Sequence, residues 1–97
     1  MFTITVIFTV KEAHAEDFKS LLLKQAHDSL NKELACRVFD VSISTTKDGL
    51  VSFFLYELYD TEADFKAHLA SDHFVNFNQV SAEFVVSKVV NDWQKIA

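Results

Sequence analysis

The sequence contains no proline, a single glycine and a single cysteine among its 97 residues. Because Gly49 stands alone, the chain has no glycine-rich loop of the kind that cradles nucleotide phosphates. The lone Cys36 excludes an internal disulfide, which suits a reducing compartment, and we expect a cytoplasmic protein. No tract of proline, glycine or serine divides the chain, so residues 1–97 are expected to form one domain.

Long hydrophobic runs and basic clusters are also missing. The apolar runs are much shorter than a membrane-spanning helix, and the apolar N-terminal segment carries alternating threonines, which is typical of a strand rather than a signal peptide. The formal net charge is −5, and the nine lysines and arginines are spread along the chain. We therefore expect neither nucleic acid nor a membrane as a partner.

Phenylalanine is what the sequence has in excess, with ten residues in a chain that is 13% aromatic. A domain this small has little interior in which to bury so many rings. Some of them are therefore expected to line a pocket or a subunit interface.

Periodicity predicts the element order β-α-β-β-α-β. Alternating apolar and β-branched residues predict strands at residues 1–10, 36–46, 50–59 and 84–90. Helical spacing predicts helices at residues 12–32 and 61–80, the second with a break near Ser71 and Asp72. A turn over residues 47–49 joins the two middle strands, and residues 91–97 are expected to be a tail.

This order predicts a ferredoxin-like α+β fold, in which a four-stranded antiparallel sheet carries both helices on one face. The opposite face of such a sheet is bare. The strand at residues 50–59 is apolar on both sides, with Phe53 and Leu55 on one and Phe54 and Tyr56 on the other. A second copy of the chain is the expected cover, which predicts a homodimer through the open sheet face.

His68 and His73 flank the predicted helix break, in a segment rich in aromatic residues. Histidine exchanges protons near neutral pH, so a pair beside an apolar cavity suits acid–base chemistry on a small organic molecule. A structural role, such as capping a helix end, is the open alternative. A metal site with Asp72, completed by Glu57 or Asp40, is disfavoured because a spacing of five does not place both rings on one helix face.

The other reactive side chains have simpler explanations. His14 and His27 lie on the polar side of the first helix and are expected at the surface. Cys36 has no evident base nearby, so a buried structural thiol is expected. Glu57 and Asp40 interrupt apolar strands, either as pocket acids with raised pKa or as partners of a basic residue.

Several of these segments together resemble a known family. The residues YELYD at 56–60, followed by Phe65, His68 and SDHF at 71–74, resemble the antibiotic biosynthesis monooxygenase superfamily, and so does CRVFDV at 36–41. The resemblance implies a dimeric ferredoxin-like α/β barrel with a pocket between the sheet and the second helical region. It also implies oxygenation without a cofactor, in which the deprotonated substrate itself reduces dioxygen.

Haem degradation, which also occurs in this superfamily, is not expected. The haem-degrading members have an asparagine in the first strand, where this chain has Val6, Ile7 and Phe8. They have a tryptophan at the position of His68, and their haem-ligating histidine corresponds to a position near Asn78.

The leading hypothesis is a cofactor-independent monooxygenase, an oxidoreductase that uses dioxygen and a small quinol-like, phenolic or enolisable substrate. His73 is the predicted proton acceptor, and His68 assists it or orients the substrate; no metal or other cofactor is expected. The predicted substrate contacts are Phe39, Tyr56, Glu57, Phe74 and Phe77. The alternatives are a non-catalytic small-molecule-binding dimer and an isomerase-type or decarboxylase-like enzyme in the same pocket.

Overall fold

The computed structural model describes residues 1–45 and 48–97. Their strands form one antiparallel sheet with the order β2-β3-β1-β4. The strands are β1 (Phe2–Lys11), β2 (Cys36–Thr45), β3 (Leu50–Tyr59) and β4 (Val85–Gln94). The predicted ferredoxin-like α+β fold is confirmed, because each neighbouring pair in this order is antiparallel and the helices fall between the strands as expected.

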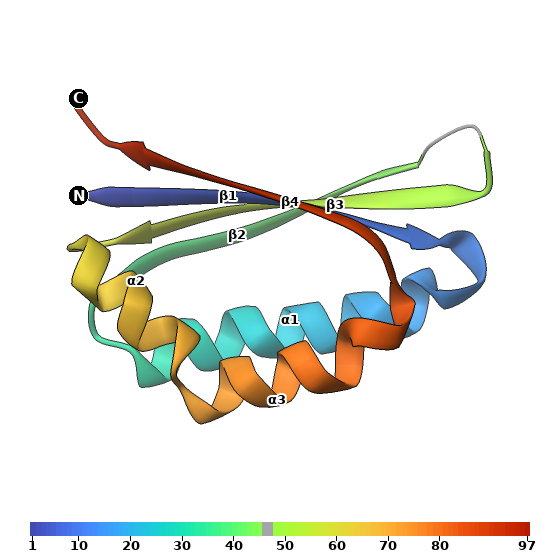
Figure 1. Cartoon of the computed structure of the whole chain (residues 1–97), viewed down its shortest axis with the longest axis horizontal. Helices are drawn as coiled ribbons and strands as arrows, with labels where there is room; N and C mark the ends of the chain where they lie inside the picture. Colours follow the sequence, from blue (N-terminus) through green and yellow to red (C-terminus); the bar gives the residue numbers. More distant parts are fainter. Residues whose placement is uncertain (46–47) are drawn as a thin grey trace.

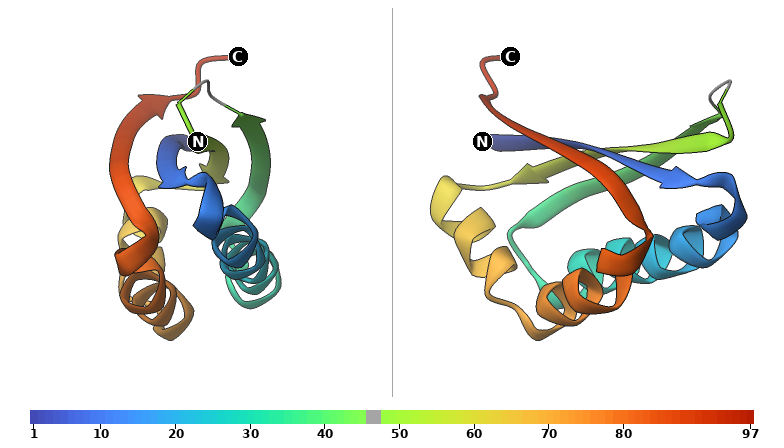
Figure 2. Two further views of the ribbon diagram at one scale, coloured as in Figure 1. Left: turned by 90° about the vertical axis from the view of Figure 1, so that its right-hand side faces the viewer. Right: turned by 45° about the vertical axis from the view of Figure 1, so that its right-hand side comes forward.

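The helices form a second layer on one face of the sheet, which curves over them (Figures 1 and 2). They are α1 (Ala15–Lys32), α2 (Glu62–Leu69) and α3 (Asp72–Ser81), with one-turn helices η1 (Glu12–His14) before α1 and η2 (Ala82–Phe84) after α3. None of the helices in the described ranges is long and apolar enough to cross a membrane.

The core lies between these two layers. Alternate residues of β1, including Ile4, Val6 and Phe8, are at most 5% exposed and face the helices. Phe18 on α1 is fully buried against them, with its ring 5.1 Å from that of Phe8 in an edge-to-face contact. Strand alternation in β1 and helical spacing in α1 thus bury one face of each of these two elements, as the sequence predicts.

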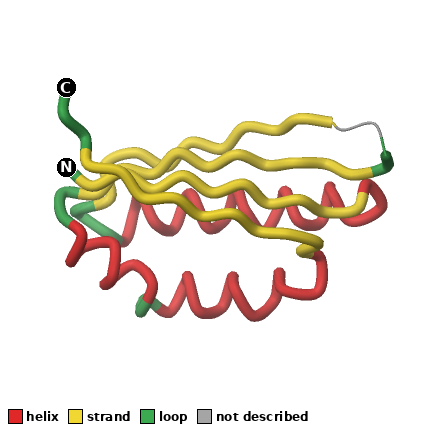
Figure 3. The backbone as a smooth tube through the Cα atoms, turned by 45° about the horizontal axis from the view of Figure 1, so that its top comes forward, coloured by secondary structure: helices red, strands yellow, loops and turns green. Residues whose placement is uncertain are grey.

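The predicted break in the second helical region is confirmed. Thr61 caps α2 with a reciprocal capping box, in which its side chain accepts from the Asp64 N–H and the Asp64 carboxylate accepts from the Thr61 N–H. A short loop then separates α2 from α3 (Figure 3). Ser71 Oγ accepts from the Phe74 N–H at 3.3 Å and donates to the His68 carbonyl at 2.6 Å, so one hydroxyl ends α2 and begins α3.

The last strand is longer than predicted. Residues 91–94 are not part of a tail, because they pair with the beginning of β1, where Phe2 lies opposite Gln94 and Thr3 opposite Trp93. The turn predicted over residues 47–49 falls partly on Lys47, and the predicted strand over residues 36–46 ends on Thr46; both residues lie outside the described ranges. Gly49 has φ +69°, a conformation that glycine adopts without strain.

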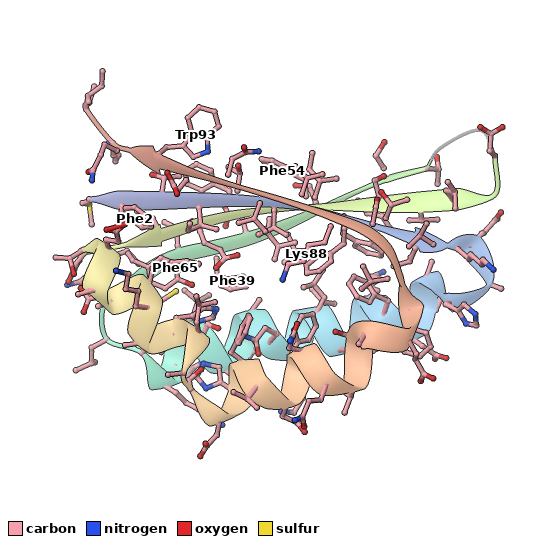
Figure 4. The ribbon with its side chains drawn as sticks, in the orientation of Figure 1. Phe2, Phe39, Phe54, Phe65, Lys88 and Trp93 are labelled. Atoms are coloured by element: carbon pink, nitrogen blue, oxygen red, sulfur yellow. The ribbon has the colours of Figure 1, made fainter. Side chains whose placement is uncertain are left out.

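The sheet face opposite the helices carries exposed apolar side chains. Phe54 and Trp93 point away from the helices (Figure 4) and are 42% and 54% exposed. Ile7 and Val89, which pair across β1 and β4, lie on the same face and are about half-exposed. In the single chain, therefore, one side of the sheet holds the core and the other is uncovered.

Candidate functional site

A cavity of ≈280 Å³ lies between the sheet and the helices. Most of its wall is apolar, and Phe39 and Phe65 point into this space in Figure 4. Its polar lining residues are Gln25, Glu57, His68 and Lys88, one each from α1, β3, α2 and β4. The volume is near the lower end of the range for small-ligand pockets, so the cavity is large enough for a compact ring compound.

Strand register aims two of these polar groups at the cavity. Glu57 lies opposite Ile4 and Phe39, and Lys88 lies opposite Phe8. Both charged side chains therefore occupy rows that otherwise point apolar side chains toward the helices. The Lys88 ammonium lies over the ring of Phe8, with Nζ 5.4 Å from the centroid.

His68 is the histidine that lines this cavity, and its side chain is 3% exposed. Its Nδ1 is 2.8 Å from Oε2 of Glu33, and its Nε2 is 3.9 Å from Oε1 of Glu57. A carboxylate only accepts hydrogen bonds, so we assign the proton of the neutral ring to Nδ1 and leave Nε2 as an acceptor. Burial lowers the pKa of His68, and this effect outweighs that of Glu33, which raises the pKa. The lowered pKa favours the neutral ring.

Glu33 connects the two histidines. It is the C-cap residue that follows α1, and its N–H donates to the Ser29 carbonyl at 3.1 Å. Its Oε2 also lies 2.5 Å from Nε2 of His73, whose side chain is 7% exposed. Ser71 Oγ is 3.2 Å from the same nitrogen, and its own proton goes to the His68 carbonyl. Both imidazoles are therefore held by one carboxylate oxygen.

Glu57 is a second titratable group in the cavity wall. It is 3% exposed, and burial raises its pKa to about 7, while the hydrogen bond from the Tyr59 hydroxyl, 2.6 Å long, opposes the rise. Both the acid and the carboxylate are therefore populated near neutral pH.

Five of the seven predicted site residues line the cavity, namely His68, Phe39, Glu57, Phe74 and Phe77. His73 does not; it borders a smaller hollow of ≈20 Å³ between α1 and α3. Tyr56 does not either, because alternation along β3 turns Glu57 inward and Tyr56 toward the opposite face.

In the single chain Tyr56 is therefore outside this cavity, and its contact with a substrate stays a prediction. Asp40, the other strand acid considered, lies opposite Tyr56 in the register and is exposed, so it does not line the cavity.

Three polar residues of the site were missed, and each has a signal in the sequence. Glu33 places a carboxylate at the C-terminal end of a helix, where the helix dipole disfavours negative charge. Gln25 interrupts the apolar face of α1, and Lys88 interrupts the last strand as Glu57 interrupts the third. Such mismatches between residue type and element are typical of functional sites.

The remaining reactive side chains behave as predicted. Cys36 is 5% exposed, and burial raises the pKa of its thiol to about 12, so it remains protonated and unreactive. His14 and His27 are exposed.

Glu33, His68 and His73 are also a possible metal-ligand set, with one donor atom from each lying within 4.8 Å of the others. Ligand atoms of one tetrahedral zinc ion lie roughly 3.3 Å apart, given metal–ligand bonds of about 2.0–2.1 Å. The Glu33 oxygen is only 2.8 and 2.5 Å from the two histidine nitrogens. These are hydrogen-bond distances, so the geometry favours direct hydrogen bonds over a shared ion.

Comparison with known proteins supports the family resemblance that the sequence shows. The sequence model of the family described as "Antibiotic biosynthesis monooxygenase" matches residues 1–80. No curated protein matches the chain.

Solved structures share the fold over nearly the whole chain. The "Putative antibiotic biosynthesis monooxygenase" of Nitrosomonas europaea is 23% identical, with a TM-score of 0.88 over 98% of this chain and 89% of that one. A protein of the same description from Caulobacter crescentus is 21% identical, with a TM-score of 0.89 over 99% and 90%. PA3566 from Pseudomonas aeruginosa is 20% identical, with a TM-score of 0.84 over 99% and 94%.

Proposed function

Because the chain belongs to the antibiotic biosynthesis monooxygenase family, we propose that it is a cofactor-independent monooxygenase acting on a small quinol-like, phenolic or enolisable compound. The observation that carries this proposal is a buried His68 in the wall of an apolar cavity, with Nδ1 held by Glu33. Burial lowers the pKa of His68, which favours the neutral ring. Such a histidine is a general base whose acceptor nitrogen is available at neutral pH.

In the proposed reaction, Nε2 of His68 takes a proton from the substrate, and Glu33 stabilises the imidazolium that forms. The electron-rich anion then reduces dioxygen. An activated CH₂ group becomes C=O, and the second oxygen atom leaves as water, so the substrate supplies all the electrons. The apolar wall limits competing water, and the Lys88 ammonium, at the Phe8 and Phe74 rings, can stabilise the anion.

His73 has a positioning role in this proposal rather than the role of proton acceptor that the sequence suggested. It donates to Glu33 and so fixes the carboxylate that orients His68. Glu57, whose pKa is raised to about 7, can return a proton to the departing oxygen. We also propose that the protein is a cytoplasmic homodimer that pairs through the exposed sheet face of Phe54 and Trp93.

The proposal is tested by measuring dioxygen consumption with a panel of quinols and enolisable phenols. Replacing His68 by alanine should lower kcat/KM at least about 100-fold, the usual contribution of a general base. Replacing His73 by alanine should have a smaller effect, because the base itself remains. The matched control is His27→Ala, which removes an exposed histidine and should leave the rate unchanged.

A wild-type protein that consumes no dioxygen with any member of the panel contradicts the proposal. A His68→Ala variant as active as the wild type contradicts the assigned base.

A second candidate function is isomerisation in the same cavity. His68 Nε2 and Glu57 Oε1 lie 3.9 Å apart, and two proton-carrying groups at one ligand can move a proton between two of its atoms. Turnover that continues without dioxygen identifies this function. A ligand that co-purifies without any turnover identifies the non-catalytic binding dimer instead.

A further inference from the structure

Gln25 places an unpaired amide in the wall of the same cavity. It lies on α1, and the whole residue is 3% exposed. Neither Oε1 nor Nε2 has a hydrogen-bond partner within residues 1–45 and 48–97. Leaving a buried polar group unpaired destabilises the folded protein, so most native proteins avoid it. A buried amide that borders a ligand-sized cavity is therefore expected to serve the ligand.

The chemistry of the amide defines its partner. A primary amide presents an acceptor oxygen and a donor nitrogen side by side in one plane. Its complement is a group with a donor beside an acceptor, and the two then form a pair of parallel hydrogen bonds. Asparagine and glutamine read the edge of adenine in this way.

We propose that Gln25 selects a planar ring ligand that presents a hydrogen-bond donor and acceptor side by side on one edge, as a lactam does. This inference deepens the proposed function, because it places the ligand in the same cavity as His68. Gln25 comes from a different element than the two proton carriers, so its two hydrogen bonds fix the in-plane orientation of the ring before proton transfer.

The surroundings of Gln25 suit a flat ring. Phe74 and Phe77 from α3 and Phe8 from β1 line the same cavity, and the Phe8 and Phe77 ring centroids are 6.1 Å apart. Aromatic walls bind a planar ring by stacking and edge contacts but give little preference for its orientation. The amide supplies the directional contact that these walls lack.

A water molecule is the competing partner for the amide. Gln25 also borders the hollow of ≈20 Å³ between α1 and α3, which is about the size of one water. If this water satisfied the amide, the cavity would not distinguish a ligand with the donor–acceptor edge from one without it. The two cases therefore differ in a measurable preference.

The test is equilibrium binding of 2-quinolone and coumarin by calorimetry under nitrogen. The two bicyclic molecules have nearly the same shape, but the lactam N–H of 2-quinolone is a ring oxygen in coumarin. The wild type should bind 2-quinolone at least about 10-fold more tightly, because coumarin leaves the Gln25 oxygen unpaired. Gln25→Met keeps the chain length and removes the amide, so it should bind both compounds equally.

The matched control is Ser29→Ala. Ser29 lies one turn further along α1, is fully buried and has an unpaired hydroxyl among the described residues, but it does not line the cavity. This variant should keep the wild-type preference. Thermal unfolding checks the fold of both variants, and Gln25→Met should melt no lower than the wild type because it loses an unsatisfied group.

Three outcomes overturn the inference: equal wild-type affinity for the two compounds, no wild-type binding of 2-quinolone, or a preference that persists in Gln25→Met. The first two are decided by the wild type alone, even if a variant fails to fold. Binding under nitrogen needs no turnover. A wild type that prefers 2-quinolone but consumes no dioxygen therefore contradicts the proposed monooxygenase activity and leaves the role of Gln25 intact.

Discussion

At the scale of single residues, the cavity depends on ionisable groups that are expensive to bury. Glu57 occupies an inward row of β3 that alternation would otherwise fill with an apolar side chain. The Tyr59 hydroxyl donates to it, but burial still raises its pKa to about 7. This carboxylic acid therefore exchanges protons in the pH range where enzymes act, and its ionisation is linked to stability.

The linkage predicts how stability depends on pH. The pKa of Glu57 is about 7 in the folded protein against an ordinary value of 4.5, so between these values the folded state binds a proton that the unfolded state has released. The free energy of unfolding should fall as pH rises through this range, by about 3 kcal/mol from this group. Glu57→Gln should be more stable than the wild type at pH 8 and nearly equal to it at pH 4.

Urea denaturation of both proteins at the two pH values measures this difference. An identical pH dependence in the wild type and Glu57→Gln would show that Glu57 is not a buried acid.

At the scale of secondary-structure elements, the break between α2 and α3 builds the site. It joins two short helices of different direction, so that His68 near the end of α2 and His73 near the start of α3 reach one oxygen of Glu33. Ser71 makes this junction, because its hydroxyl contacts the backbone of both helices and the ring of His73.

Two cap variants separate the stability of this region from its function. Ser71→Ala and Thr61→Ala each remove a side-chain N-cap and should each lower the free energy of unfolding by about 1 kcal/mol. Only Ser71→Ala should also lower dioxygen consumption, because only Ser71 contacts His68 and His73. Equal activity of the two variants, measured beside their urea denaturation curves, would argue against a role for the junction in the site.

Much of the secondary structure can be predicted from the sequence. Alternation predicts the third strand at residues 50–59, which are the bounds of β3, and the capping residues predict the helix break at its observed position. These features depend on local signals, namely alternation and capping residues. The extension of β4 to Gln94 depends on pairing with β1 at the other end of the chain, which no local pattern of Asn91 or Asp92 reveals.

The candidate site was predictable only in part, for the same reason. His68 and Glu57 stand out in the sequence, but Glu33 is 35 residues from His68 and reaches it only because α1 ends beside α2. The sequence favours His73 over His68 as the proton acceptor, but His68 is the histidine that lines the cavity. Both rings contact Glu33, and only their positions relative to the cavity, which the tertiary structure determines, distinguish the two histidines.

At the scale of the whole molecule, the sheet is covered on one side only. Ile7, Phe54, Val89 and Trp93 lie on the uncovered side, and each is 42% exposed or more. An apolar face of this kind on a small domain is typical of a protein–protein interface. A second copy of the chain would bury it with a two-fold symmetric contact.

A charge on this face should break the proposed dimer. Phe54→Lys would bury an unpaired ammonium at the interface, so light scattering after gel filtration should give the mass of one chain for the variant and of two for the wild type. The control is Leu34→Lys, which alters a 94% exposed apolar residue between α1 and β2 and should remain a dimer. A monomeric wild type, or a Phe54→Lys variant that stays dimeric, contradicts pairing through this face.

The proposed function requires that the fold hold His68 as a neutral base with its acceptor nitrogen at the cavity. The most direct measurement is ¹⁵N NMR of the His68 ring at pH 7, with the signal assigned by its loss in His68→Gln. Glu33 and the burial of the ring predict a neutral imidazole with the proton on Nδ1 and a bare Nε2. A ring protonated on Nε2 alone, or on both nitrogens, would contradict the assignment of His68 as the general base.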